Sequence, residues 1–146
     1  MSSLNELLDS LSNESYLKGK QFEEIAKWFF LTDPAWTTKT SKVWNWEEYP
    51  KKWGPDRGID LVCEFKDGSH WAVQAKCYFP QYSIKKSDLD SFLSETSRSE
   101  IQGRILIAST DLLGPGARNV IDNQEKHIVL VLRNNLERAD VTFPSN

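Results

Sequence analysis

The chain has 146 residues, the length of one domain of ~100–150 residues with a hydrophobic core of its own. Its mixture of 39% hydrophobic, 27% charged and 12% aromatic residues excludes an intrinsically disordered chain. The net charge of −3 argues against a uniformly basic, nucleic-acid-binding surface. No apolar run approaches the ~18–20 residues of a membrane helix, and the N-terminus lacks the pattern of a secretory signal, so we expect a cytoplasmic protein without a membrane partner.

The first third of the chain is predicted to be mainly helical. Leucines at helical spacing after Ser2 and Ser3 indicate a short helix near the N-terminus. A longer helix over about 17–31 is indicated by apolar residues that recur every three or four positions, and it ends before Pro34. The Thr-rich segment 36–44 indicates a first strand, and the Gly- and Pro-containing segment 45–58 is irregular.

The rest of the chain alternates between strands and helices. A hairpin is predicted from strands over 59–65 and 69–79. It is followed by a helix over about 88–98 with Ser87 as its N-cap, a strand over 104–109, a short helix up to about 123 and a strand over 128–132. The resulting order, α-β-β-β-α-β-α-β, predicts an α/β fold with a mixed central β-sheet flanked by helices.

Polar side chains of the predicted hairpin meet only in one register. Gln74 and Lys76 are two residues apart and therefore share one face of their strand. A three-residue loop over 66–68, with Gly68 in the left-handed conformation, places Asp60 opposite Gln74, whereas a two-residue turn would move Asp60 to the other face. The alternative is structural: Asp60 caps a strand, Gln74 satisfies a main-chain group and Lys76 is a solvated edge residue. Polar groups within such apolar strands are costly unless they are paired or bind something.

Two motifs resemble a known nuclease family. Asp60, preceded by Gly58-Ile59 and followed by Gln74-Ala75-Lys76, is similar to the site of the PD-(D/E)XK nucleases, and the glutamine resembles their Mrr-like branch. The sequence 19–23, Gly-Lys-Gln-Phe-Glu, resembles the Gly-x-x-Phe-Glu helix of that branch, and the predicted order contains its αβββαβ core. The Trp-rich insert before Asp60 is similar to the N-terminal nuclease domain of type ISP (single-polypeptide type I) restriction-modification enzymes.

The resemblance implies metal-dependent hydrolysis of phosphodiester bonds. Asp60, Gln74 and the main-chain carbonyl of Ala75 would hold Mg²⁺, with Mn²⁺ as a substitute. Lys76 would orient the attacking water or stabilise the developing charge. Glu23 would be an outer metal ligand, or else an acid on the helix surface. Because Gln74 is neutral, we expect weaker metal binding than in the acidic variant of the motif.

The Pro55-Asp56 pair is an alternative to Asp60 as the acidic position of the motif. Asp56 lies in a Gly- and Pro-containing loop rather than on a strand, so we prefer Asp60. Cys63 and Cys77 are ~20 Å apart in the predicted register, which excludes a disulfide. The sequence contains no Gly-x-x-x-x-Gly-Lys-Ser/Thr phosphate-binding loop, so any ATP use belongs to domains outside this chain.

Basic residues gather in two segments around the hairpin. Segment 39–57 holds five basic and three acidic side chains, interleaved with aromatic residues from Trp44 to Trp53, and segment 76–86 holds three basic side chains and no acid. Aromatic and basic residues together can stack on bases and contact phosphates, but the tryptophans can equally serve to cover the edge of the sheet. The candidate DNA-binding residues are Lys39, Lys42, Lys51, Lys52, Arg57, Lys85 and Lys86.

The sequence therefore predicts a single nuclease domain over 1–146, with a core of about 17–132, as the N-terminal part of a longer enzyme. We expect a Mg²⁺-dependent endonuclease that cuts double-stranded DNA without sequence specificity of its own. The resemblance implies partners: a helicase-like ATPase and a methyltransferase in the same polypeptide, and a second nuclease domain for double-strand cleavage. The alternatives are a stand-alone or methylation-dependent Mrr-type nuclease, and a catalytically degenerate domain that binds DNA or supports assembly.

Overall fold

A five-stranded mixed sheet forms the centre of the computed structural model, which describes residues 4–55 and 58–139. The hairpin and the strand before it pair antiparallel, whereas the later strands follow helical crossovers and pair parallel. The predicted mixed sheet is thus confirmed. In spatial order the strands are β1 (Thr40–Asn45), β2 (Leu61–Phe65), β3 (His70–Lys76), β4 (Gly103–Ala108) and β5 (Ile128–Val131).

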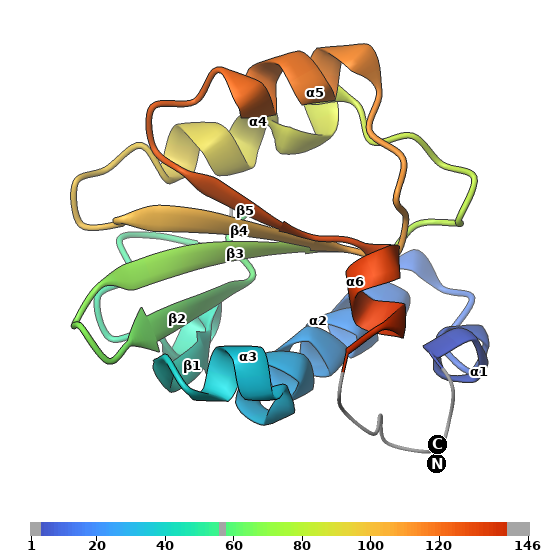
Figure 1. Cartoon of the computed structure of the whole chain (residues 1–146), viewed down its shortest axis with the longest axis horizontal. Helices are drawn as coiled ribbons and strands as arrows, with labels where there is room; N and C mark the ends of the chain where they lie inside the picture. Colours follow the sequence, from blue (N-terminus) through green and yellow to red (C-terminus); the bar gives the residue numbers. More distant parts are fainter. Residues whose placement is uncertain (1–3, 56–57, 140–146) are drawn as a thin grey trace.

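Helices cover both faces of this sheet (Figure 1). One face is covered by α1 (Leu4–Asp9), α2 (Ser15–Thr32), α3 (Pro34–Thr37) and α6 (Arg133–Glu137), and the other by α4 (Lys86–Glu95) and α5 (Pro115–Asp122). A short 3₁₀ helix, η1 (Trp46–Glu48), follows β1. Among the described residues, no helix combines the length and the hydropathy that a membrane span requires.

Several element boundaries differ from the sequence prediction. The predicted first strand loses Trp36 to α3, because Asp33 accepts the Ala35 N–H and Pro34 occupies the first helical position. Ser87 is not the cap of α4, because the helix begins at Lys86 and Ser87 lies in its first turn. The elements η1 and α6 were not predicted, and the second hairpin strand ends at Lys76 rather than 79.

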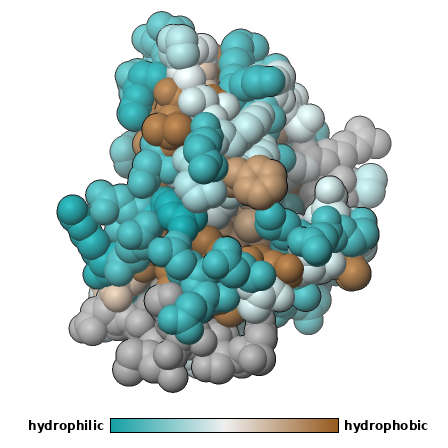
Figure 2. Space-filling view, turned by 90° about the vertical axis from the view of Figure 1, so that its right-hand side faces the viewer, coloured by the Kyte–Doolittle hydropathy of each residue, from teal (hydrophilic) through white to brown (hydrophobic). Residues whose placement is uncertain are grey.

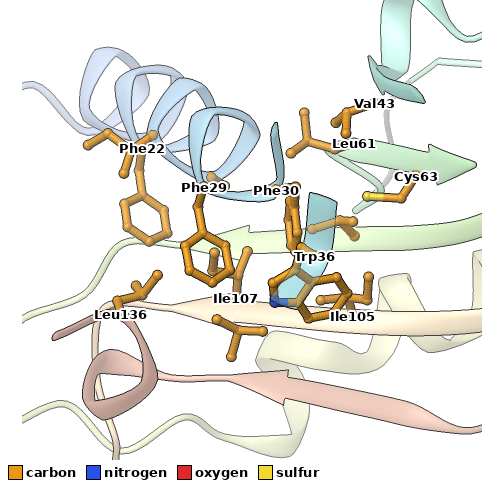
Figure 3. Close-up of a cluster of buried hydrophobic side chains, with 14 of the residues drawn as sticks. Phe22, Phe29, Phe30, Trp36, Val43, Leu61, Cys63, Ile105, Ile107 and Leu136 are labelled. Carbon is orange, nitrogen blue, oxygen red and sulfur yellow. The ribbon is translucent and has the colours of Figure 1, made fainter. Parts of the chain in front are cut away.

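The larger hydrophobic core lies between α2 and the sheet (Figure 3). Phe22, Phe29 and Phe30 project from the predicted apolar side of α2, and none is more than 3% exposed. The Phe30 ring meets the Trp36 ring edge to face, with centroids 4.9 Å apart. These side chains pack against apolar residues of the strands, including Leu61, Val73, Ile105 and Ile107.

The aromatic residues after β1 form part of a second core on the opposite face. Trp46 is 2% exposed and Tyr49 is 1% exposed, and they pack with Val62, Ala72 and other buried residues. The Tyr49 hydroxyl lies 2.5 Å from Nδ1 of His70. The structure therefore favours the structural alternative for Trp46 and Tyr49, because rings buried this deeply cannot stack on DNA bases.

Candidate active site

The hairpin of β2 and β3 has the predicted register over most of its length. Leu61 lies opposite Val73, and Cys63 lies opposite Trp71. The three-residue loop is closed by the Phe65 N–H, which donates to the Ser69 carbonyl at 2.9 Å, and Gly68 has a φ of +89°. This register carries Asp60, Gln74 and Lys76 to the same end of the sheet.

Asp60 differs from the prediction in its pairing with β3. β2 begins at Leu61, and the Asp60 N–H donates to the Val73 carbonyl at 2.9 Å. The Asp60 carboxylate accepts the Ala75 N–H at 2.7 Å. It takes the place of a main-chain acceptor, because β2 begins only at Leu61. Asp60 thus contacts the β3 main chain on both sides of Gln74.

Ala75 presents its main chain to Asp60. The N–H and C=O of one strand residue point toward the same neighbouring strand. Because the Ala75 N–H reaches the Asp60 carboxylate, the Ala75 carbonyl lies on that side of β3 too. An oxygen from the main chain and a carboxylate therefore lie next to each other at this end of the sheet.

Gln74 is buried beneath α4, with 2% of its surface exposed. Its Nε2 lies 3.4 Å from the Asp88 carbonyl, a long hydrogen bond. Its Oε1 is buried and accepts no hydrogen bond from the described residues. Buried polar atoms nearly always have partners, so this oxygen suits a cation or water as its ligand. Together with Asp60 and the Ala75 carbonyl, it is the kind of hard oxygen donor that Mg²⁺ prefers.

Lys76 ends β3 and is half-buried, and its ammonium group acts on Asp88 of α4. Burial alone would raise the pKa of Asp88, but hydrogen bonds from the Lys85 N–H and the Tyr82 hydroxyl, together with the charge of Lys76, lower it below its usual range. Asp88 therefore stays ionised, and these hydrogen bonds hold its carboxylate in place. It fixes a negative charge beside the lysine.

Glu23 approaches this end of the sheet from α2. It is 8% exposed, and its carboxylate lies 3.6 Å from Nζ of Lys20, which also lies 3.4 Å from Glu47. One turn further along α2, Lys27 donates to Asn45 at 2.8 Å, at the end of β1. Since the chain then turns so that the Trp46 N–H donates to the Asp60 carbonyl, α2 passes close to the start of β2.

The chain matches the model of a family described as restriction endonuclease over residues 31–145. It belongs to this restriction endonuclease family. Its structure is similar to a DNA-bound, ATP-dependent type ISP restriction-modification enzyme, LlaBIII, over 97% of this chain, with 25% identity and a TM-score of 0.80. It also has the fold of the MspJI restriction endonuclease, solved with a 27-mer oligonucleotide, over 84% of this chain with 15% identity and a TM-score of 0.54.

These similarities are limited in extent. This chain spans 9% of the LlaBIII chain and 28% of the MspJI chain. No curated protein sequence matches it. The family match begins at residue 31, so it includes Asp60, Gln74 and Lys76 but not Glu23. The chain is therefore a nuclease domain of the kind found in restriction enzymes.

The predicted DNA-binding cations of this restriction endonuclease domain do not form one patch. Lys39 lies beside the hairpin loop, where its carbonyl accepts the Lys66 N–H, and Lys42 pairs opposite Glu64. Both are therefore at the end of β2 away from Asp60. Lys51 and Lys52 follow η1, and Lys85 and Lys86 lie at the start of α4 next to Asp88. These six lysines are all exposed. Arg57 and Asp56 lie outside the described residues.

Sequence reasoning missed the role of Asp88 and of the tyrosines around it. Tyr82 donates to the Asp88 carboxylate at 2.7 Å, and the Tyr78 ring lies against the Tyr82 ring with centroids 4.2 Å apart. An acidic residue in the first turn of a helix signals only a helix start. Its approach to Lys76 depends on how α4 docks on the sheet, which no local pattern reveals. Within the described residues, no three His, Cys, Asp or Glu side chains cluster in a way that could hold a metal ion.

Proposed function

We propose that this restriction endonuclease domain hydrolyses phosphodiester bonds of double-stranded DNA with the help of a divalent cation, Mg²⁺ in the first place and Mn²⁺ as a substitute. Asp60, the Gln74 side-chain carbonyl and the Ala75 main-chain carbonyl would hold the ion. The observation that carries the proposal is the buried Oε1 of Gln74, which has no hydrogen-bond partner among the described residues. Gln74 directly precedes Ala75, whose N–H donates to the Asp60 carboxylate. Such a cation would act as a Lewis acid on the phosphate and lower the pKa of bound water.

The protein's own groups would position the substrate and stabilise charge. The hydrogen bond from the Ala75 N–H fixes the Asp60 carboxylate against β3. Lys76, held beside the ionised Asp88, would direct its ammonium group at the phosphate oxygens that gain charge during hydrolysis. Glu23, close to the start of β2, would act from the outer shell of the site.

We further propose that the domain is the nuclease module of a longer ATP-driven restriction-modification enzyme. The similarity to LlaBIII over nearly the whole of this chain supports this assignment. The helicase-like ATPase and the methyltransferase would then be other domains of the same polypeptide. A second nuclease domain would cut the opposite strand, and the domain itself would not choose the sequence.

Cleavage of a supercoiled plasmid tests the proposal. Wild-type protein is expected to nick or cut the plasmid in Mg²⁺ or Mn²⁺ and to be inactive in EDTA. Asp60→Asn keeps an oxygen that can accept the Ala75 N–H but removes the negative charge, so it should cut at least ~100-fold more slowly while staying folded. Lys76→Ala should also be impaired. Lys66→Ala is the matched control, because Lys66 is exposed in the loop at the other end of the hairpin.

The neutral Gln74 favours a second candidate function, a domain that binds DNA without cutting it. That alternative predicts DNA binding with no cleavage in any metal and at any protein concentration. Lys76→Ala would then lower only the salt-dependent affinity for DNA. If Asp60→Asn cuts as fast as wild type, the proposed ion site is wrong.

A further inference from the structure

A cavity of about 430 Å³ lies beyond the end of β3. It opens between the first turns of α2 and the segment that directly follows Lys76. Figure 2 looks onto this end of the molecule, where apolar side chains lie among mostly hydrophilic ones. Its volume lies within the range of ~300–1,000 Å³ that is usual for small-molecule sites.

The lining of the cavity suits an anionic ligand with a flat ring. Lys18 is the charged residue among those that line it, and no carboxylate does so. Phe79 is 73% exposed, although burial is the usual state of such a side chain. Nζ of Lys18 lies 4.8 Å from the centroid of the Phe79 ring. A cation and an exposed ring beside each other are the elements with which proteins hold a phosphate and a base.

Gly19 leaves the α2 side of the cavity open. It lies inside a helix, where glycine is less stable than alanine, and its φ is not in the left-handed region. A Cβ atom at this position would meet nothing within 4 Å. Neither backbone conformation nor packing therefore requires glycine here. The absence of a side chain leaves room for a ligand to approach the helix backbone at Gly19.

The cavity is linked to the proposed catalytic residues through Tyr82. Tyr82 lines the cavity, and its hydroxyl donates to the Asp88 carboxylate. The positive charge of Lys76 interacts electrostatically with this carboxylate. Phe79 is three residues after Lys76, so their Cα atoms are at most ~11 Å apart. That distance corresponds to about three base steps at ~3.4 Å each. A ligand in the cavity would thus lie within about three nucleotides of a phosphate bound at Lys76.

We propose that the cavity binds one unstacked nucleotide of the DNA strand that is cut, close to the scissile phosphate. Its base would lie against the Phe79 ring, its sugar against the open surface at Gly19, and its phosphate near Lys18. The inference rests on the proposed function of the domain in DNA cleavage and adds to it a site for a single nucleotide outside the helical stack.

The test compares two fluorescent duplexes of equal length, one fully paired and one with a single bulged nucleotide. Binding is followed by fluorescence anisotropy in EDTA, so that neither duplex is cut. A bulged nucleotide has already left the stack, so wild-type protein is expected to bind this duplex about tenfold more tightly, the effect of one base–aromatic stack. Phe79→Ala should reduce this preference to less than about twofold, and Gly19→Leu, which fills the cavity, should do the same.

Trp28→Ala is the matched control, because Trp28 is an exposed aromatic residue of α2 that does not line the cavity. It should keep the full preference for the bulged duplex. Equal binding of both duplexes by wild type, or an unchanged preference in Phe79→Ala, overturns the nucleotide site. Should Gly19→Leu fail to fold, the binding preference of Phe79→Ala decides the test, because Phe79 is exposed. Plasmid cleavage by wild type without any preference for the bulge rejects this inference only, whereas absence of both binding and cleavage rejects the proposed function as well.

Discussion

Gln74 combines deep burial with a carbonyl oxygen for which the described part of the chain offers no donor. Leaving such an oxygen unpaired lowers the stability of a folded protein by about 1–3 kcal/mol. At Gln74, which lies between the two main-chain contacts that Asp60 makes with β3, such an oxygen is expected to serve binding or catalysis. A substitution at Gln74 can therefore distinguish an effect on stability from an effect on cleavage.

We predict that Gln74→Met lowers activity without lowering stability. Methionine has a similar length and removes the unpaired oxygen, at the expense of one long hydrogen bond to Asp88. The free energy of unfolding in urea should stay the same or rise by up to about 1 kcal/mol. The cleavage rate should fall ~10- to 100-fold through loss of metal affinity.

Thr40 supplies a matched control, because its hydroxyl is the other buried side-chain oxygen without a partner among the described residues. Thr40→Val should raise stability similarly and leave cleavage unchanged. Gln74→Glu should keep an oxygen ligand and bind the metal more tightly than Gln74→Met does. If Gln74→Met cuts at the wild-type rate, Gln74 is not a ligand.

At the scale of elements, the hairpin shows why part of the site was predictable. Loop length and Gly68 fix the register of β2 and β3 locally, so the approach of Asp60 to Gln74 could be predicted from sequence. The direct pairing of Asp60 was wrong, because the end of a ladder depends on where the neighbouring strand begins. The approach of Asp88 to Lys76 also depends on tertiary packing, and no spacing in the sequence indicates it.

We predict that Gly68→Ala destabilises the hairpin through its backbone alone. A Cβ atom at Gly68 meets nothing within 4 Å, but its φ of +89° is a conformation that alanine adopts only with strain. The free energy of unfolding should fall by about 1–2 kcal/mol. Gly54→Ala is the matched control, because a Cβ there also meets nothing and its φ is ordinary. Equal stability of the two variants in urea would show that the loop does not depend on the left-handed residue.

At the scale of the whole molecule, the lowered pKa values of several carboxyl groups predict that the domain loses stability in acid. The hydrogen bond with His70 lowers the pKa of Glu64, and the hydrogen bonds from Ser69 lower the pKa of Asp67. Asp88 has a lowered pKa as well, because its hydrogen bonds and Lys76 outweigh its burial. These carboxyl groups bind protons more weakly in the folded than in the unfolded chain. Their contribution is present above the unfolded-state pKa of ~4 and is lost as the pH falls toward the folded-state values.

We therefore predict that the melting temperature changes little from pH 7 to about pH 5 and then falls steadily toward pH 2.5. Glu64→Gln removes one of the groups responsible, so the difference in melting temperature between this variant and wild type should shrink as the pH falls. Glu125→Gln is the control, because Glu125 is exposed and accepts no hydrogen bond from the described residues. Circular dichroism melts at each pH measure the effect. A constant difference between Glu64→Gln and wild type across this range would mean that the His70 pair does not couple proton binding to folding.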